Sequence, residues 1–254
     1  MDVDTERVEE LLREYGCPWP RPEFVSSTGS TNGDLLARIE GGSDAEALAG
    51  LCRVAGEQTH GRGRRGRSWS SDRGAGLWCS TIVNGADTWL PLVASLAVVD
   101  AVRALTGVDL HIKWPNDVLD HDDRKIAGVL VESRGVMSVI GIGMNLDYRA
   151  ENLPHPNATS WRLLVGAPPD RNELVAALLE SLWRRSSGPR ERNLLDYRDG
   201  SRTIGTRVRV SLPGGRMISG LATDVDDHGF LVVRQDDGSE QIVVAGDVIH
   251  ANIG

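Results

Sequence analysis

The two lysines of this chain lie close together in a sequence that otherwise takes its positive charge from arginine. Lys113 is part of His-Ile-Lys-Trp-Pro-Asn-Asp (111–117), and Lys125 is part of Arg-Lys-Ile-Ala-Gly (124–128). A lysine ammonium is a compact point charge that approaches a single oxygen closely, whereas the arginine guanidinium is a planar fork. Chance placement in an arginine-rich sequence is the alternative for both residues. Otherwise the pair is suited to holding an anionic oxygen at close range.

A glycine- and arginine-rich segment precedes the lysines, Gly-Arg-Gly-Arg-Arg-Gly-Arg-Ser-Trp (61–69), here called the arginine loop. Its glycines allow the backbone to bend tightly around a ligand, and its guanidinium groups supply charge-assisted hydrogen bonds. The ring of Trp69 can pack against a flat or apolar part of that ligand. Arginine–glycine segments also form solvated loops or bind RNA, so the loop alone leaves its ligand open. Together with the lysines, it predicts an enzyme that acts on a phosphate or acyl-phosphate.

Polar side chains follow Lys113 at a turn that contains a proline. Pro115 favours an extended conformation before it and would present Asn116 and Asp117 at a strand end, near the segment of Lys125. Their oxygens could coordinate a magnesium ion that bridges phosphates, or receive an incoming amine. The alternative is that Asn116 and Asp117 only cap a turn.

Two further segments predict backbone that approaches a ligand closely. Gly128, three residues past Lys125, leaves room beside its strand. The run Gly-Ile-Gly-Met-Asn-Leu (141–146) is a strand exit with two glycines and the amide of Asn145, or an ordinary glycine-rich bend.

Composition indicates an ordinary soluble globular protein, with 254 residues, 40% hydrophobic and 25% charged. The three cysteines are odd in number and widely spaced, which favours reduced thiols and a cytoplasmic location. Neither a signal peptide nor a membrane-spanning segment is expected. The formal net charge of −8 disfavours general binding to nucleic acid, so a small anion at the arginine loop is the expected partner.

The spacing of apolar residues predicts a mixture of helices and strands. A short amphipathic helix over 4–15 is too brief and acidic to read DNA. Polar residues 26–32 follow a short strand at 24–25 and cap the next helix, whose free amides can receive a polar ligand. Further strands are predicted over 47–57, 77–83, 110–114, 126–133 and 137–146. Further helices are predicted over 90–105, 172–185 and 190–199.

From Gly205 the pattern changes to short strands separated by turn residues. They are predicted over 206–212, 216–225, 229–234, 240–244 and 247–251, which is typical of a small all-β barrel. We therefore expect two domains. The first covers 1–202, with 1–23 as a short helix and lead-in, and the second covers 203–254.

These segments, in this order, resemble the biotin protein ligase family over about residues 24–252. The resemblance is carried by five segments: Ser30-Thr31-Asn32, 57–67 (Glu-Gln-Thr-His-Gly-Arg-Gly-Arg-Arg-Gly-Arg), 113–117 (Lys-Trp-Pro-Asn-Asp), 124–128 and 141–146. It implies an α/β (α+β) fold: a mixed-sheet, class II synthetase-like biotin/lipoate ligase catalytic domain, followed by an SH3-like β-barrel. It also implies biotin and ATP as substrates, with Mg2+ bound mainly through the ATP phosphates. The partner would be the biotin carboxyl carrier domain of a carboxylase.

The resemblance also assigns roles to individual residues. Catalysis would fall to Lys125, Arg62 and Asp117, with Asp117 orienting the acceptor lysine. Biotin would be bound by Ser30, Thr31, Asn32, Gln58, Arg62, Gly63, Arg64, Lys125 and Gly128. ATP and the adenylate would be bound by Arg62, Arg64, Arg65, Arg67, Trp69, Asn116, Lys125 and Asn145.

Two departures from the family and two alternatives complete the expectations. Many relatives carry a DNA-binding domain ahead of the catalytic one, but only about 23 residues precede the resemblance, so no repressor role is expected. Relatives often carry an arginine near the chain's end, where this chain has His250. A lipoate or octanoate ligase is one alternative, and an RNA-binding module is the other. The protein is expected to be a monomer or a homodimer.

Overall fold

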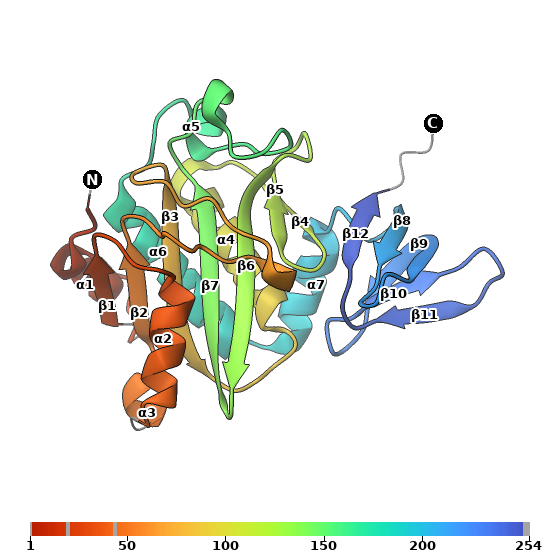
Figure 1. Cartoon of the computed structure of the whole chain (residues 1–254), viewed down its shortest axis with the longest axis horizontal. Coiled ribbons are helices and arrows are strands. Elements are labelled where there is room, and N and C mark those ends of the chain that lie inside the picture. Colours follow the sequence, from red (N-terminus) through yellow and green to blue (C-terminus); the bar gives the residue numbers. More distant parts are fainter. Residues whose placement is uncertain (1, 19–20, 43–44, 251–254) are drawn as a thin grey trace.

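The computed structural model describes residues 2–18, 21–42 and 45–250, which form two sheets with helices around the larger one (Figure 1). The strands of the large sheet are β1 (Arg21–Val25), β2 (Leu51–Ala55), β3 (Gly76–Asn84), β4 (His111–Lys113), β5 (Asp117–Leu119), β6 (Lys125–Arg134) and β7 (Met137–Asn145). The strands of the small sheet are β8 (Arg207–Ser211), β9 (Met217–Val225), β10 (Leu231–Arg234), β11 (Glu240–Val243) and β12 (Asp247–His250). The helices are α1 (Thr5–Glu14), α2 (Thr31–Glu40), α3 (Ala45–Leu48), α4 (Leu90–Thr106), α5 (Trp161–Val165), α6 (Arg171–Ser187) and α7 (Arg190–Gly200).

The large sheet is mixed and has the strand order β1-β2-β3-β7-β6-β5-β4. β1 and β2 are parallel, and each of the other neighbouring pairs is antiparallel. The central pair, β3 and β7, stays in register from Gly76↔Asn145 to Asn84↔Met137. Both strands are buried along nearly their whole length because helices cover the sheet on both faces. This central pair gives the site a rigid support.

Helices α4 and α6 pack against each other on one face of the large sheet, while α2 lies on the opposite face (Figure 1). α4 starts with Pro91 in its first turn and ends at Gly107. Gly107 has the left-handed conformation (φ 72°) that suits glycine at a helix end. α1 packs on α6, so the N-terminal helix is part of the same core.

The small sheet is antiparallel, with the order β11-β10-β9-β8-β12. Among the described residues its strands form an open row, with β11 and β12 at the two edges. The turn between β9 and β10 is bound to the larger body by side chains that donate to its carbonyls. The indole nitrogens of Trp89 and Trp114 donate to Asp227 O (2.6 Å) and Gly229 O (3.0 Å). Trp114 is therefore a core residue and also an anchor for the small sheet.

Most elements predicted from the sequence are present within a few residues of their expected ends, but one predicted strand needs correction and several short elements were not predicted. The strand predicted over 47–57 is wrong at both ends, since residues 47–48 belong to α3 and the strand covers Leu51–Ala55. The short strand β5 was not predicted, although Asp117 does lie at a strand end as expected. The helix α5 was not predicted, because five residues are too few for a clear helical period. Residue 251, the predicted end of the last strand, lies outside the described residues.

Candidate functional site

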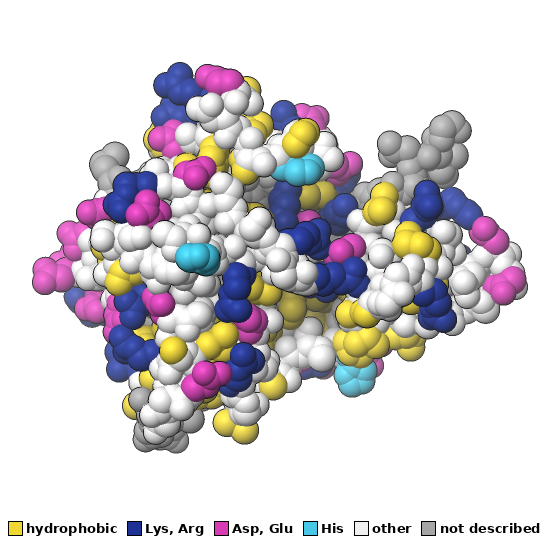
Figure 2. All heavy atoms as spheres, in the orientation of Figure 1, with side chains coloured by type: hydrophobic (Ala, Val, Ile, Leu, Met, Phe, Trp, Pro, Cys, Tyr) yellow, Lys and Arg dark blue, Asp and Glu magenta, His cyan; other side chains and the backbone are white. Residues whose placement is uncertain are grey.

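A cavity of about 610 Å³ opens where α2, the arginine loop, strands β5 to β7 and the start of β12 meet. Lys and Arg side chains gather in the hollow between the larger body and the small sheet (Figure 2). The residues predicted for the site line this cavity with one exception. Those that line it are Ser30, Thr31, Asn32, Gln58, Arg62, Gly63, Arg64, Arg67, Trp69, Asn116, Asp117, Lys125, Gly128 and Asn145. The exception is Arg65, which points to the small sheet instead.

The start of α2 supplies a buried polar network to one end of the cavity. Ser30 caps the helix, because its hydroxyl accepts a hydrogen bond from the Gly33 amide (3.4 Å). Thr31 donates from its backbone to Gln58 Oε1 (2.9 Å), and its hydroxyl lies 2.6 Å from Ser80 Oγ. Ser80 in turn donates to Asn32 Oδ1 (2.6 Å). Thr31, Asn32 and Ser80 are buried, so these hydrogen bonds fix the orientation of each group.

Two glycines allow side chains to lie directly on the strands at the cavity floor. A Cβ on Gly141 would lie 2.1 Å from Asn32 Oδ1, and one on Gly143 would lie 2.6 Å from Trp69 Nε1. Neither distance is sterically possible without movement of the neighbour. The indole nitrogen of Trp69 is buried and has no hydrogen-bond partner within the described chain. The ring of Trp69 therefore lines the cavity while its nitrogen is packed against the Gly143 backbone.

Lys125 lies at the centre of the cavity with two different partners. Its ammonium is 2.5 Å from Asp117 Oδ1 and 4.9 Å from the centroid of the Trp69 ring. Asp117 is brought there by the β5–β6 pairing, which sets it opposite Gly128. The adjacent Lys113 also lines the cavity, and none of the described residues forms an ion pair with it. Both lysines of the chain therefore line the same cavity.

Three arginines of the loop contact the beginning of β12. Arg64 donates to Asn116 Oδ1 (3.2 Å) and to Gly246 O (3.4 Å). Arg65 and Arg67 both bind Asp247, at 3.0 and 2.7 Å. Burial lowers the pKa of Arg64, while the nearby carboxylate of Asp247 opposes that shift.

Asn116 and Asn145 use their amides to fix the cavity wall. Asn116 Nδ2 donates to Val129 O (2.7 Å), and Asn145 Nδ2 donates to Thr159 O (3.0 Å). Asn145 Oδ1 is buried without a partner in the described residues. An unpaired buried oxygen is costly, so this atom is an exception to the otherwise satisfied polar groups around the cavity.

Three contributors to the site were not found from the sequence: Ser80, Glu132 and Asp247. Ser80 lies within an apolar strand, and Glu132 accepts a hydrogen bond from Arg62 (3.0 Å). Asp247 lies in the last strand, far from the arginine loop in sequence. The excess of arginine in the loop was the one feature of the sequence that indicated carboxylate partners such as Glu132 and Asp247. The side chain of His250 lies outside the described part of the structure.

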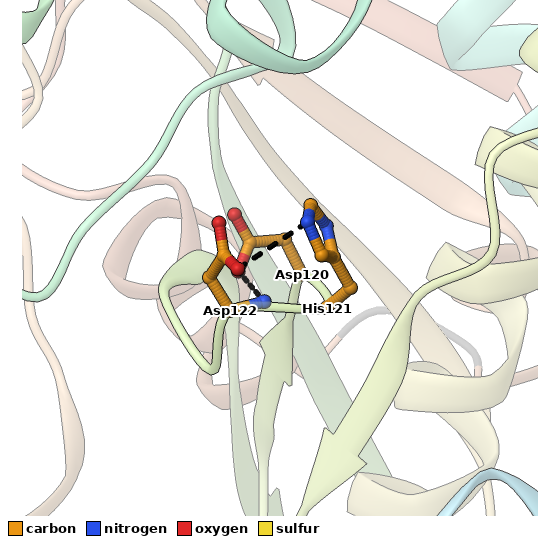
Figure 3. A group of neighbouring side chains, drawn as sticks. All are labelled: Asp120, His121 and Asp122. Carbon is orange, nitrogen blue, oxygen red and sulfur yellow. Dashed lines mark hydrogen bonds and ion pairs between the residues drawn. The ribbon is translucent and has the colours of Figure 1, made fainter.

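A cluster of possible metal ligands, Asp120, His121 and Asp122, lies in the turn between β5 and β6 (Figure 3). The buried carboxylate of Asp120 already accepts hydrogen bonds from two backbone amides of the turn, and it forms an ion pair with Arg124 at 2.8 Å. His121 and Asp122 are exposed. The cluster therefore stabilises a turn, and its buried carboxylate is already used by hydrogen bonds and an ion pair within the protein.

No helix among the described residues has the length and apolar character needed to cross a membrane.

Sequence comparisons match two parts of the chain to protein-family models. Residues 30–146 match the biotin/lipoate A/B protein ligase family, and residues 203–251 match the biotin protein ligase C terminal domain. The biotin--[acetyl-CoA-carboxylase] ligase of Mycobacterium tuberculosis is 41% identical over 261 residues, covering 98% of this chain and 96% of that protein. The ligase of the same name from Paracoccus denitrificans is 32% identical, covering 89% of this chain and 98% of that protein.

The fold is also similar to solved structures. Biotin protein ligase from Aquifex aeolicus in complex with biotin and ATP superposes with a TM-score of 0.75 at 25% identity. The match covers 91% of this chain and 99% of that chain.

Proposed function

Because this chain belongs to the biotin protein ligase family, we propose that it activates biotin with ATP and transfers it to a lysine of a biotin carboxyl carrier domain. The observation that carries the proposal is the cavity of about 610 Å³ on which the buried polar network, Lys125 and the arginine loop converge. Its volume lies in the range of small-molecule sites, about 300–1,000 Å³. The polar network suits a ureido ring, whereas a lipoate or octanoate ligase needs only apolar walls for a linear chain.

The first step joins two anions, which repel each other. An oxygen of the biotin carboxylate attacks the α-phosphorus of ATP, the bond from that phosphorus to the bridging oxygen breaks, and pyrophosphate leaves. Lys125, Arg62 and Arg64 offset the repulsion and stabilise the negative charge that grows on the phosphoryl oxygens. Lys125 is suited to this role because its ammonium lies in the cavity beside a carboxylate that an incoming anion can replace.

The biotinyl-adenylate is a mixed anhydride that water hydrolyses, so it must be sheltered until transfer. The arginine loop already has contacts to the small sheet through Arg65 and Arg67, and we assign it the role of cover. Trp69 and Asn145 both line the cavity, and we assign them to the nucleotide side of the site.

In the second step the lysine amine of the carrier attacks the acyl carbon, and AMP leaves with the bonding electrons. Asp117 accepts a hydrogen bond from this amine and aligns it with the anhydride, which supplies much of the rate of this step. The amine must be neutral to attack, and a carboxylate at this place can receive its proton.

Mg2+ fits the proposal as an ion that arrives with the ATP phosphates, because the carboxylates at the cavity are engaged by lysine or arginine. When bound, it would neutralise phosphate charge, and the side-chain oxygens of Asn116 and Asp117 are the groups of this chain that could contribute to holding it. We also propose that residues 1–202 form the catalytic domain and residues 203–254 an SH3-like domain. The cytoplasm is the proposed location, since the buried thiols of Cys52 and Cys79 lie 3.4 Å apart without forming a disulfide.

The direct test is mass spectrometry of a biotin carboxyl carrier domain after incubation with this protein, biotin and Mg-ATP. The proposal expects one added biotinyl group, and the same reaction with lipoate in place of biotin is the specificity control. A carrier domain that gains no mass with biotin, or gains lipoyl instead, would refute the proposed function.

A further inference from the structure

One carboxylate oxygen links Asn32 and Arg62, two residues on the side of the cavity assigned to biotin, here called the biotin-facing wall. Glu132 Oε2 accepts a hydrogen bond from Asn32 Nδ2 (2.9 Å) and another from Arg62 (3.0 Å). Asn32 belongs to α2 and Arg62 to the arginine loop, and both line the cavity. Glu132 itself is on β6 and is not among the residues that line the cavity. It therefore contacts these two residues from behind the wall.

The charge of Glu132 determines which way the Asn32 amide faces. Asn32 Oδ1 accepts from Ser80 (2.6 Å), while Nδ2 donates to Glu132 and to Leu130 O (3.3 Å). A flipped amide would set its oxygen against a carboxylate and a carbonyl, which repel it. The amide lies directly against Gly141, in the space that a Cβ at this position would fill. Without Glu132, one restraint on this orientation is lost.

Glu132 also restrains Arg62. The Arg62 side chain is 45% exposed and has no other hydrogen-bond partner in the described chain. A guanidinium carries five N–H donors, so an anchor at one end leaves the others free for an anion in the cavity. A long side chain that is already held loses less conformational freedom when a ligand binds.

We propose that Glu132 is a positioning residue for biotin, acting through Asn32 and Arg62 rather than by contact with substrate. The inference rests on the proposed function. It expects Glu132→Ala to raise KM for biotin by about 10- to 100-fold, as for loss of a charge-assisted restraint. KM for ATP, measured at saturating biotin, is expected to rise less than KM for biotin, because only Arg62 of the two residues that Glu132 holds is also assigned to the phosphate.

An ion pair between the same helix and strand supplies a control. Glu40 of α2 binds Arg134 of β6 at 2.9 Å, and neither residue lines the cavity. Glu40→Gln removes a carboxylate from the α2–β6 contact without touching the biotin-facing wall. It is expected to leave both KM values unchanged.

The experiment measures biotin-dependent pyrophosphate release and thermal unfolding for the parent protein, Glu132→Ala, Glu132→Gln and Glu40→Gln. Glu132→Gln keeps an acceptor oxygen but no charge, so its KM for biotin should lie between those of the parent protein and Glu132→Ala. Should Glu132→Ala fail to fold, Glu132→Gln tests the same claim by its own rise in KM for biotin.

Three outcomes distinguish a failure of the inference about Glu132 from a failure of the proposed function. Folded Glu132 variants with an unchanged KM for biotin would overturn the inference. Equal rises in both KM values, with the same loss of Tm in Glu40→Gln, would mean that Glu132 only stabilises the fold and would also overturn it. A parent protein that releases no pyrophosphate with biotin would contradict the proposed function itself, which the variants do not test.

Discussion

Lys125 and Asp117 form an ion pair inside the cavity, with 2.5 Å between Nζ and Oδ1. The same arrangement recurs around the site, since Arg62 binds Glu132 and Arg67 binds Asp247. These positively charged side chains around the cavity therefore have carboxylate counterions within the described structure. The cations are already held in place around the cavity, so an anion that binds there would require little reorganisation of them.

Replacing Lys125 tests the step that joins the two anions. Lys125→Ala is expected to reduce pyrophosphate release on the order of 100- to 1,000-fold, the usual effect of removing one electrostatic stabiliser. Its unfolding temperature should stay close to that of the parent protein, because the side chain is partly exposed. Lys125→Arg should rescue poorly, since a planar fork cannot replace a point charge between Asp117 and the Trp69 ring. Normal pyrophosphate release by Lys125→Ala would remove Lys125 from the mechanism.

Replacing Asp117 should separate the two half-reactions. Asp117→Asn keeps a hydrogen-bond acceptor for Lys125 but cannot take a proton from the incoming amine. We expect adenylate formation to change by less than about fivefold, while transfer to the carrier domain falls about 10- to 100-fold. Single-turnover assays that start from preformed biotinyl-adenylate measure the transfer step alone. Equal losses in both steps would show that Asp117 acts only through Lys125.

The contact between the arginine loop and the small sheet depends on Asp247. Asp247→Ala removes the partner of both Arg65 and Arg67, and we expect biotinyl-adenylate to escape into solution faster by about three- to tenfold. Stability should hardly change, because partly exposed ion pairs contribute little, about 0–1 kcal/mol. Asp236→Ala, which breaks the exposed Arg207–Asp236 pair of the same sheet, is the control. An equal escape rate in both variants would argue against the role of Asp247.

Replacing Arg64 is a second test of the arginine loop as a cover for the adenylate. Its guanidinium contacts Asn116 and the Gly246 carbonyl, so it joins the cavity wall to the small sheet. Arg64→Ala should weaken retention of the adenylate by about 10-fold or more, because a buried cation that faces an anion is lost. Released biotinyl-adenylate can be measured by chromatography after a single turnover. Unchanged release would count against the loop as a cover.

Much of this site could be predicted from sequence because its residues come in short local motifs. The lysine pair, the arginine loop and the glycines of 141–146 each reveal their chemistry within a few neighbouring residues. Strands with strong apolar patterns were found for the same reason. Asp247 and Glu132 were not predicted, because each acts on an arginine more than 60 residues away through the folding of the chain. The interaction of Arg65 with the small sheet was not predicted for the same reason: its partner Asp247 is distant in the sequence.

The tight contact between β7 and α2 leads to the last prediction. Gly141→Ala would place a Cβ 2.1 Å from Asn32 Oδ1, so the amide must leave its place beside Ser80. Overpacking of this kind costs about 1–3 kcal/mol, and we expect a lower Tm together with a loss of biotin affinity. Gly200→Ala at the end of α7, where an added Cβ meets nothing within 4 Å, should leave both unchanged. Calorimetric titration with biotin and thermal unfolding measure the two effects. Because a Cβ at Gly141 strikes a ligand-facing amide rather than the apolar core, affinity should fall more than stability, and the reverse order would place Asn32 outside the biotin site.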